Sequence, residues 1–255
     1  MTEFKSPLDM LYHWETNHPN DVYLRQPING KIHSFTWAEI GLEVRKVAAG
    51  LKALSLAPGS RICIFSKNCA QWFITDLAIM MAGHVSVPIF ATAGGDTINY
   101  VLKHADVKLM FVGKLDNIES AVAPIPEDMP TVSFPYEGIP GKTSWAEFTD
   151  IAPLADNPTR DKDELMTIIY TSGSTGQPKG VMHSFATINW AAHACLAQLE
   201  CDSSDRVMSY LPLAHITERV IIELASFYSG MQVTFVESLD TFNHDVVNAQ
   251  PTLFV

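Results

Sequence analysis

Hydrophobic side chains in the first half of the chain recur at two different spacings. Ile40, Val44 and Val47 repeat at the spacing of one helix face, and the preceding Thr36 and Glu39 form a capping box. Shorter apolar runs have the length and composition of buried strands. The pattern predicts helices over residues 37–57, 71–82 and 94–104, and strands over residues 61–66, 85–90 and 107–112.

The middle of the chain has a weaker pattern. Prolines and glycines crowd residues 123–142, where one short strand over residues 131–134 is expected, and Ser144 with Glu147 forms a second capping box that starts a short helix. The polar residues 156–164 are typical of a surface connection. The second half then predicts strands over residues 165–170, 206–211, 231–236 and 251–255, and helices over residues 186–199, 216–228 and 241–249.

This alternation predicts the α/β class, with mainly parallel sheets flanked by helices, because parallel strands need a crossover helix between them. We expect a first α/β lobe over residues 1–160 and the start of a second lobe over residues 161–255. The chain stops within the apolar run Leu253, Phe254 and Val255. Since natural termini are usually exposed and loosely held, an incomplete domain is expected.

Composition narrows the class of protein. The 255 residues carry 17 Lys and Arg against 28 Asp and Glu, a net charge of −11, without a basic run, so nucleic acid is not an expected partner. A 47% hydrophobic content supplies a substantial core. No signal-peptide core is present, and the longest apolar stretch, residues 77–82, is too short for a transmembrane segment. We expect a cytoplasmic protein, with peripheral membrane contact left open.

Residues 170–180 carry the strongest chemical signal. This segment follows a predicted strand and contains three glycines, four Ser or Thr hydroxyls and Lys179. Glycines let the backbone approach a ligand closely, and successive amides favour an anion. Hydrogen bonds to a charged group contribute about 1.5–3 kcal/mol each, so a few of them suffice to hold a polyphosphate despite the negative net charge.

Three other interpretations of this segment fit less well. A Walker A loop needs a glycine at the position of Pro178, and the G-x-S-x-G pattern of a hydrolase nucleophile does not occur in the segment. A flexible Gly/Ser linker is the remaining alternative. Linkers rarely lie between a buried strand and a helix, so phosphate binding is favoured.

Residues 171–180 resemble the phosphate-binding signature of the adenylate-forming superfamily, which includes acyl-CoA synthetases, luciferases and peptide-synthetase adenylation domains. Residues 211–220 are similar to the next motif of that superfamily, and their His-x-x-Glu-Arg form looks most like the long-chain fatty acyl-CoA synthetases. The resemblance covers essentially the whole chain. It implies an incomplete N-terminal adenylation domain, with the phosphate loop in residues 161–255 and the C-terminal lid domain absent.

The resemblance implies an ATP-dependent long-chain fatty acid–CoA ligase, an acid–thiol ligase that activates a carboxylate as acyl-adenylate and then forms a thioester. ATP, Mg²⁺ and coenzyme A are the implied cofactors, and a fatty acid is the other substrate. A ligase for a medium-chain or aryl acid, or a non-catalytic interaction fragment, remain alternatives. Without the lid, we expect the chain alone to be inactive, and we expect uncovered apolar surface to make it self-associate.

The same resemblance implies roles for individual residues. Thr171 is expected to meet Mg²⁺ and a phosphate, and Lys179 and His215 are the expected catalytic residues, His215 at the junction of the acyl tunnel and the adenylate. His183 and His193 lack the spacing of metal ligands. The phosphate cradle is expected to consist of Thr171, Ser172, Gly173, Ser174, Thr175, Gly176 and Lys179.

Four further residues are interpreted as structural and not as part of the site. Glu218 and Arg219 fit a solvated first helical turn, where an acidic residue suits the N-terminal dipole. Trp190 and Phe227 fit the core face of their helices rather than the lining of an acyl pocket.

Overall fold

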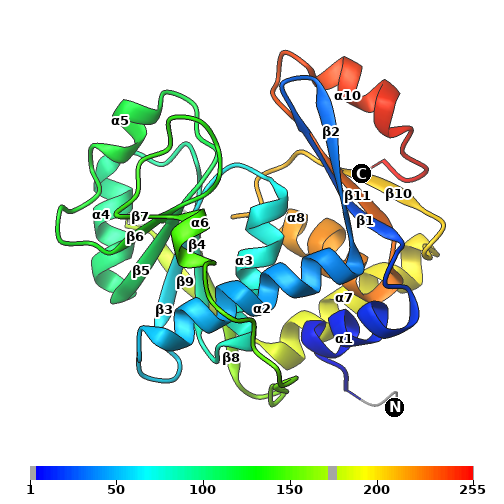
Figure 1. Ribbon diagram of the computed structural model, residues 1–255, viewed down its shortest axis with the longest axis horizontal. Coiled ribbons are helices and arrows are strands. Elements are labelled where there is room, and N and C mark those ends of the chain that lie inside the picture. The colour runs from blue at the N-terminus through cyan, green and yellow to red at the C-terminus, as the bar shows by residue number, and fades with distance from the viewer. Residues whose placement is uncertain (1–3, 172–176, 255) are drawn as a thin grey trace.

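Two β-sheets organise the chain in the computed structural model, which describes residues 4–171 and 177–254. Helix α3 (Ala70–Met81) lies between the two sheets and packs on strands of both (Figure 1). Every residue of α3 is buried, as expected for a helix that is apolar on nearly all sides. The larger core cluster accordingly joins α3 to side chains from both sheets.

The larger sheet has seven strands in the order β7-β6-β5-β3-β4-β8-β9. Neighbouring strands are parallel except β8 and β9, which form an antiparallel pair at one edge. The strands are β3 (Arg61–Phe65), β4 (Val85–Ile89), β5 (Val107–Val112), β6 (Thr131–Ser133), β7 (Thr143–Ser144), β8 (Leu165–Thr171) and β9 (Lys179–Ser184).

The smaller sheet has four strands in the order β10-β11-β1-β2. Strand β11 is parallel to both of its neighbours, and β1 and β2 form a hairpin. Asn29 and Gly30 make the turn of this hairpin with positive φ angles of 51° and 72°, a backbone shape that Asn-Gly pairs favour. The strands are β1 (Val22–Ile28), β2 (Lys31–Thr36), β10 (Arg206–Ser209) and β11 (Gln232–Phe235).

Helices connect and cover the strands, and both predicted capping boxes are present, at Thr36 and at Ser144. A third capping box, at Ser6, starts α1. The other helices are α1 (Pro7–Asn17), α2 (Trp37–Ala53), α4 (Gly95–His104), α5 (Ile118–Val122), α6 (Trp145–Phe148), α7 (Phe185–Leu199), α8 (Ile216–Glu218), the π-helix η1 (Arg219–Leu224), α9 (Ala225–Ser229) and α10 (Phe242–Ala249).

Successive crossover helices lie on opposite faces of the larger sheet. Ile62 and Ile64 of β3 belong to the core cluster that contains α3, whereas Cys63 and Phe65 belong to the cluster that contains α4. The chain therefore leaves β3 towards one face and leaves β4 towards the other. In open α/β sheets this reversal creates a crevice beyond the carboxyl ends of the strands, where ligands bind.

The predicted α/β class with mainly parallel sheets is confirmed. Helices α1 and α5, the β1–β2 hairpin and strands β7 and β9 are additional to the predicted elements. The strand expected over residues 251–255 is wrong for its described part, because residues 251–254 are not in a strand. The helix expected over residues 216–228 is continuous but contains the π-helical segment η1.

Strands from both sides of residue 160 meet in each sheet, and the division of the chain into 1–160 and 161–255 stays a prediction. No helix in residues 4–171 and 177–254 is both long enough and apolar enough to cross a lipid bilayer.

Candidate functional site

The β8–β9 pair positions the two ends of the predicted phosphate loop. Thr171, the last residue of β8, lies directly opposite Lys179, the first residue of β9, and both are exposed. One residue further on, a side chain at Gly180 would bring its Cβ within 2.8 Å of Ile168 Cγ2 and 3.2 Å of the Tyr170 ring. A side chain at position 180 would therefore force the two strands to shift near the end of the hairpin. The predicted cradle residues Ser172, Gly173, Ser174, Thr175 and Gly176 lie outside the described residues.

A cavity of about 570 Å³ adjoins this hairpin, and we call it the hairpin cavity. Thr171 and Pro178 line it from the hairpin, and His215 lines it from the start of α8. Thr97 and Val101 of α4 also line it. Residues more than 40 positions apart in sequence thus meet at one cavity. Lys179 is not part of its lining, but lies beside Pro178 and opposite Thr171.

His215 is the N-cap residue of α8. Its backbone is extended, and its Nδ1 accepts a hydrogen bond from the Thr217 amide at 3.2 Å. A neutral imidazole that accepts at Nδ1 carries its proton on Nε2. The exposed ring therefore presents an N–H donor at Nε2, the nitrogen that the cap leaves free.

The segment before His215 is held by the buried side chain of Asn68, which follows β3. Asn68 Nδ2 donates to the Leu211 carbonyl at 2.6 Å and to Ser209 Oγ at 2.8 Å, and Asn68 Oδ1 accepts from the Leu213 amide at 3.1 Å. Because one side chain satisfies backbone groups on both sides of residue 212, it fixes the path of the chain into His215.

Glu218 closes the same loop from its other end. Its Oε1 accepts hydrogen bonds from Ser209 Oγ at 2.8 Å, from the Tyr210 amide at 3.0 Å and from Asn68 Nδ2 at 3.3 Å. Burial raises the pKa of Glu218 from 4.5 to about 7, because desolvation outweighs the hydrogen bonds that favour the carboxylate. The interpretation of Glu218 as a solvated residue is wrong, since only 3% of it is exposed.

Arg219 is fully buried, so its interpretation as part of a solvated turn is also wrong. Its guanidinium donates to Asp76 Oδ2 of α3 at 2.5 Å, to Thr167 Oγ1 of β8 at 2.7 Å and to Glu223 Oε2 at 3.2 Å. Burial, together with the charge of Asp76, raises the pKa of Glu223 well above its usual range. This cluster ties η1 to α3 and to the strand that ends at the predicted phosphate loop.

Phe227 and Trp190, the two aromatic residues interpreted as core, differ in their exposure. Phe227 is fully buried, which confirms it as core. Trp190 is 73% exposed on α7, so its interpretation as core is wrong. His183 is half-buried on β9, and His193 lies against the Tyr228 ring with the ring centroids 4.8 Å apart.

The sequence interpretation missed the roles of Asn68, Glu218 and Arg219. No local pattern identifies Asn68, because its partners lie more than 140 positions away. Glu218 and Arg219 carry a weak signal, since they form the second half of the His-x-x-Glu-Arg segment. Among the residues that the structure describes, no group of three or more His, Cys, Asp or Glu side chains is arranged to hold a metal ion.

Comparison with other proteins places this geometry in context. The family model described as "AMP-binding enzyme" matches residues 11–255. Long chain acyl-CoA synthetase 2 of Arabidopsis thaliana is 29% identical over 279 aligned positions, which cover 99% of this chain and 42% of the relative. The chain therefore spans less than half the length of that relative.

Solved structures show the same fold. A putative long-chain-fatty-acid CoA ligase from Rhodopseudomonas palustris superposes with a TM-score of 0.85 and 17% identity, covering 100% of this chain and 63% of the other. The anthranilate CoA ligase AuaEII in complex with anthranoyl-AMP superposes with a TM-score of 0.84 and 20% identity, covering 100% of this chain and 50% of the other.

Proposed function

Because this chain belongs to the AMP-binding enzyme family, we propose that it forms the N-terminal part of an ATP-dependent acid–thiol ligase. The proposed reaction joins a carboxylic acid to AMP with release of pyrophosphate, and then transfers the acyl group to coenzyme A with release of AMP. The observation that carries the proposal is the hairpin cavity, where the ends of the β8–β9 hairpin and His215 lie together.

The proposed phosphate site is the loop between β8 and β9. Thr171 and Lys179 face each other where the strands end, so a hydroxyl and an ammonium flank the Gly- and Ser-rich residues 172–176 of the sequence. We assign Lys179 to the phosphates as a point charge, and we assign the backbone and hydroxyls of residues 171–176 to the cradle. A lysine and a set of backbone and hydroxyl donors would hold a polyanion locally, although the protein as a whole has a net charge of −11.

Mg²⁺ fits this site because Thr171 offers an oxygen ligand. The Thr171 hydroxyl is exposed at the cavity, and Mg²⁺ commonly takes only one or two protein ligands while phosphate oxygens and water supply the rest. When bound, the ion would neutralise charge on the phosphates and so lower the barrier to attack by an anionic carboxylate.

His215 is proposed to orient the acid. Its Nδ1 is occupied by the helix cap, so its Nε2–H is available to a carboxylate or phosphate oxygen within the hairpin cavity. Asn68 and Glu218 hold the loop that carries this ring, which keeps the donor in one place. Fixed donors of this kind stabilise developing negative charge better than mobile ones.

The proposed acid is a long-chain fatty acid, on the strength of the relative named as a long chain acyl-CoA synthetase. An aryl acid is the second candidate, because the structural neighbour crystallised with anthranoyl-AMP has nearly the same TM-score. A non-catalytic interaction fragment is the third. The proposed setting is the cytoplasm or a membrane surface, and we expect residues 1–255 alone not to complete the reaction.

Tripolyphosphate with Mg²⁺ is the sharpest probe of the proposed phosphate site, since it needs neither adenine nor ribose contacts. We expect it to bind the chain in calorimetry and Lys179→Met to weaken that binding about tenfold or more. Lys52→Met, which removes an exposed lysine at the end of α2, is the matched control and should leave binding unchanged. Equal affinities for the Lys179 variant and the wild type would remove the hairpin from nucleotide binding.

The acid class is tested separately on a protein extended to the full length of the relatives. Pyrophosphate release is measured with saturated fatty acids of increasing length and with anthranilate. Release with long acyl chains supports the fatty acid assignment, whereas release with anthranilate alone replaces it with the aryl assignment. No release with any acid, despite tripolyphosphate binding, favours the interaction fragment.

A further inference from the structure

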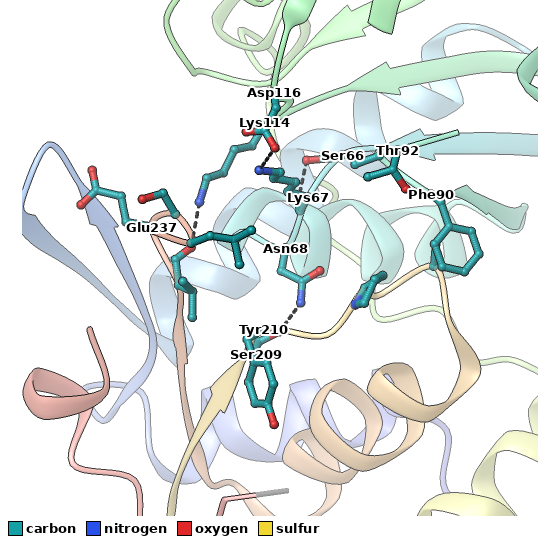
Figure 2. A pocket seen from close by; sticks show the side chains of 16 residues that line it. Ser66, Lys67, Asn68, Phe90, Thr92, Lys114, Asp116, Ser209, Tyr210 and Glu237 are labelled. Atoms are coloured by element: carbon teal, nitrogen blue, oxygen red, sulfur yellow. Dashed lines mark hydrogen bonds and ion pairs between the residues drawn. The ribbon is translucent and has the colours of Figure 1, made fainter. Parts of the chain in front are cut away.

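Two sides of the hairpin cavity are held in different ways. On one side, Asn68 fixes the segment before His215. Figure 2 shows the Asn68 side chain reaching the end of β10, where Nδ2 donates to Ser209 Oγ at 2.8 Å. On the other side, Thr171 ends β8 and starts the predicted phosphate loop. The β8–β9 hairpin lies at the edge of its sheet, so contacts from outside the sheet decide how firmly its end is held.

Tyr170, the residue before Thr171, supplies such a contact with α4. A hydrogen bond of 2.6 Å joins the Tyr170 hydroxyl to Nδ1 of His104, a residue 66 positions away in sequence. His104 is the last residue of α4. In residues 4–171 and 177–254, no other hydrogen bond joins α4 to β8 or β9.

Gly180 makes room for this contact. It lies directly opposite Tyr170 in the β8–β9 ladder. A Cβ at position 180 would lie 3.2 Å from Tyr170 Cζ, the ring carbon that carries the hydroxyl. The absence of a side chain at position 180 therefore leaves the Tyr170 ring where its hydroxyl meets α4.

Aromatic packing fixes the orientation of the two bonded rings. The His104 ring stacks on Tyr100, one turn earlier in α4, with the ring centroids 5.2 Å apart and an interplanar angle of 20°. The Tyr170 ring meets both rings edge-on, with its centroid 5.8 Å from that of His104 and 6.5 Å from that of Tyr100. Burial raises the pKa of Tyr170, so its hydroxyl keeps its proton at neutral pH. A hydroxyl that donates to Nδ1 leaves the proton of a neutral imidazole on Nε2.

The bond joins two parts of the cavity lining. Thr97 and Val101 line the hairpin cavity from α4, and Tyr170 and Thr171 line it from β8. The N-cap residue of α4 is Gly94, which supplies no side-chain cap, so the position of this helix depends on its packing and on its bond to Tyr170. A change in the distance between α4 and the end of β8 would change both the shape of the cavity and the position of Thr171.

We propose that Tyr170 and His104 are positioning residues for the phosphate loop, and that their hydrogen bond keeps Thr171 where it meets a bound polyphosphate. The inference rests on the proposed phosphate site, and it adds two residues that act through Thr171. A hydrogen bond of this kind changes a conformational equilibrium about twofold to tenfold. Since apparent affinity scales with the fraction of the protein in the binding-competent form, loss of the bond lowers affinity by up to that factor.

The first test is calorimetry of tripolyphosphate with Mg²⁺ at pH 8, where an ordinary imidazole is neutral. Tyr170→Phe removes the hydroxyl and keeps the ring, and we expect it to weaken binding about threefold to tenfold. Tyr100→Phe is the matched control. It removes a hydroxyl that makes no hydrogen bond within the described chain, from a ring of the same cluster, and should leave the affinity unchanged.

Variants of His104 separate positioning from a loss of packing. His104→Asn keeps an acceptor, Oδ1, bonded to Cγ as Nδ1 is, and should retain most of the affinity. His104→Leu keeps an apolar side chain without an acceptor, and should lose as much affinity as Tyr170→Phe. The double variant of His104→Leu with Tyr170→Phe should lose no more than either single variant, because both remove the same bond.

The ¹⁵N chemical shift of His104 Nδ1 at pH 8 tests the bond without any ligand. Tyr170→Phe should move this shift and Tyr100→Phe should not. An unmoved shift, additive losses in the double variant, or equal affinities of Tyr170→Phe and the wild type would each overturn the inference and leave the phosphate site in place. A wild-type chain that does not bind tripolyphosphate would instead remove the phosphate site, and this inference with it.

Discussion

The side chain of Asn68 and the backbone of Leu213 form a hydrogen bond of 3.1 Å between segments 145 positions apart in sequence. This bond joins the end of β3 to the loop before His215, and the Asn68 amide group adds a 2.6 Å bond to the Leu211 carbonyl. Both peptide groups depend on the same side chain. The loop that presents His215 is therefore ordered by a residue that follows a strand of the other sheet.

Asn68→Ala tests this dependence. We expect a loss of about 1–3 kcal/mol in the free energy of unfolding, because buried backbone groups lose their partners. Amide hydrogen exchange should accelerate at Leu213, measured by mass spectrometry of the corresponding peptide. Asn99→Ala is the matched control, since Asn99 is exposed and its side chain donates to the Gly95 carbonyl within the same helix, α4. Unchanged exchange at Leu213 would show that other contacts hold the loop.

Glu218 predicts a pH dependence of stability. Its pKa is about 7 in the folded protein against a usual 4.5, so between these values the folded state binds more protons than the unfolded state. Stability contributed by the protonated carboxyl is therefore present at low pH and is lost as the pH rises from about 4.5 through 7.

Urea unfolding of the wild type and Glu218→Gln at several pH values measures this effect. The stability of the wild type relative to the variant should fall between pH 4.5 and 7, by at most about 3 kcal/mol, given 1.36 kcal/mol per pKa unit. A difference that does not change with pH would mean that Glu218 titrates normally.

The ion pair between Arg219 and Asp76 is fully buried on both sides. Asp76→Asn removes one of the two carboxylates that contact the guanidinium and leaves Glu223 as the other, and we expect a loss of up to about 3–5 kcal/mol in the free energy of unfolding. The double variant Asp76→Asn with Arg219→Met should lose less than the sum of the single variants. Lys46→Met breaks a partly exposed pair with Glu43 and should cost no more than about 1 kcal/mol. Additive losses at Asp76 and Arg219 would contradict the coupling.

Gly180 tests the geometry of the hairpin. Gly180→Ala places a Cβ 2.8 Å from Ile168 Cγ2, so the two strands must move apart near Thr171 and Lys179. We expect tripolyphosphate affinity to fall several-fold. Gly94→Ala, where nothing lies within 4 Å of the added Cβ, should bind normally in the same calorimetric titration. Equal binding by both variants would show that the loop tolerates the displacement.

Self-association of residues 1–255 is a further expectation. Trp190 of α7 is 73% exposed and Met182 of the edge strand β9 is 67% exposed. Exposed apolar side chains and an unpaired strand edge both promote association. Sedimentation of the chain should show dimers or larger species, and Met182→Lys with Trp190→Lys should shift them towards monomer. A wild-type chain that sediments as a monomer would refute this expectation.

Local sequence determined most elements and the place of the hairpin that carries the predicted phosphate loop. The capping boxes at Thr36 and Ser144 and the apolar runs of β3, β4 and β5 act over a few residues, so they are visible without a structure. The Asn29-Gly30 turn is an equally local signal. It identifies the β1–β2 hairpin, which the spacing of hydrophobic residues did not predict. The family resemblance likewise depends on short, contiguous motifs.

Tertiary structure alone decided which polar groups are buried. Glu218 and Arg219 have the sequence context of an exposed helical turn, yet both are buried. Glu218 is bonded by Asn68 and Ser209. Helix α3 and strand β8 supply Asp76 and Thr167 as partners of Arg219. Trp190 shows the reverse, an apolar residue on a helix face that nothing in the described chain covers. Burial depends on which distant segments meet, and the spacing of residues along one helix carries no information about that.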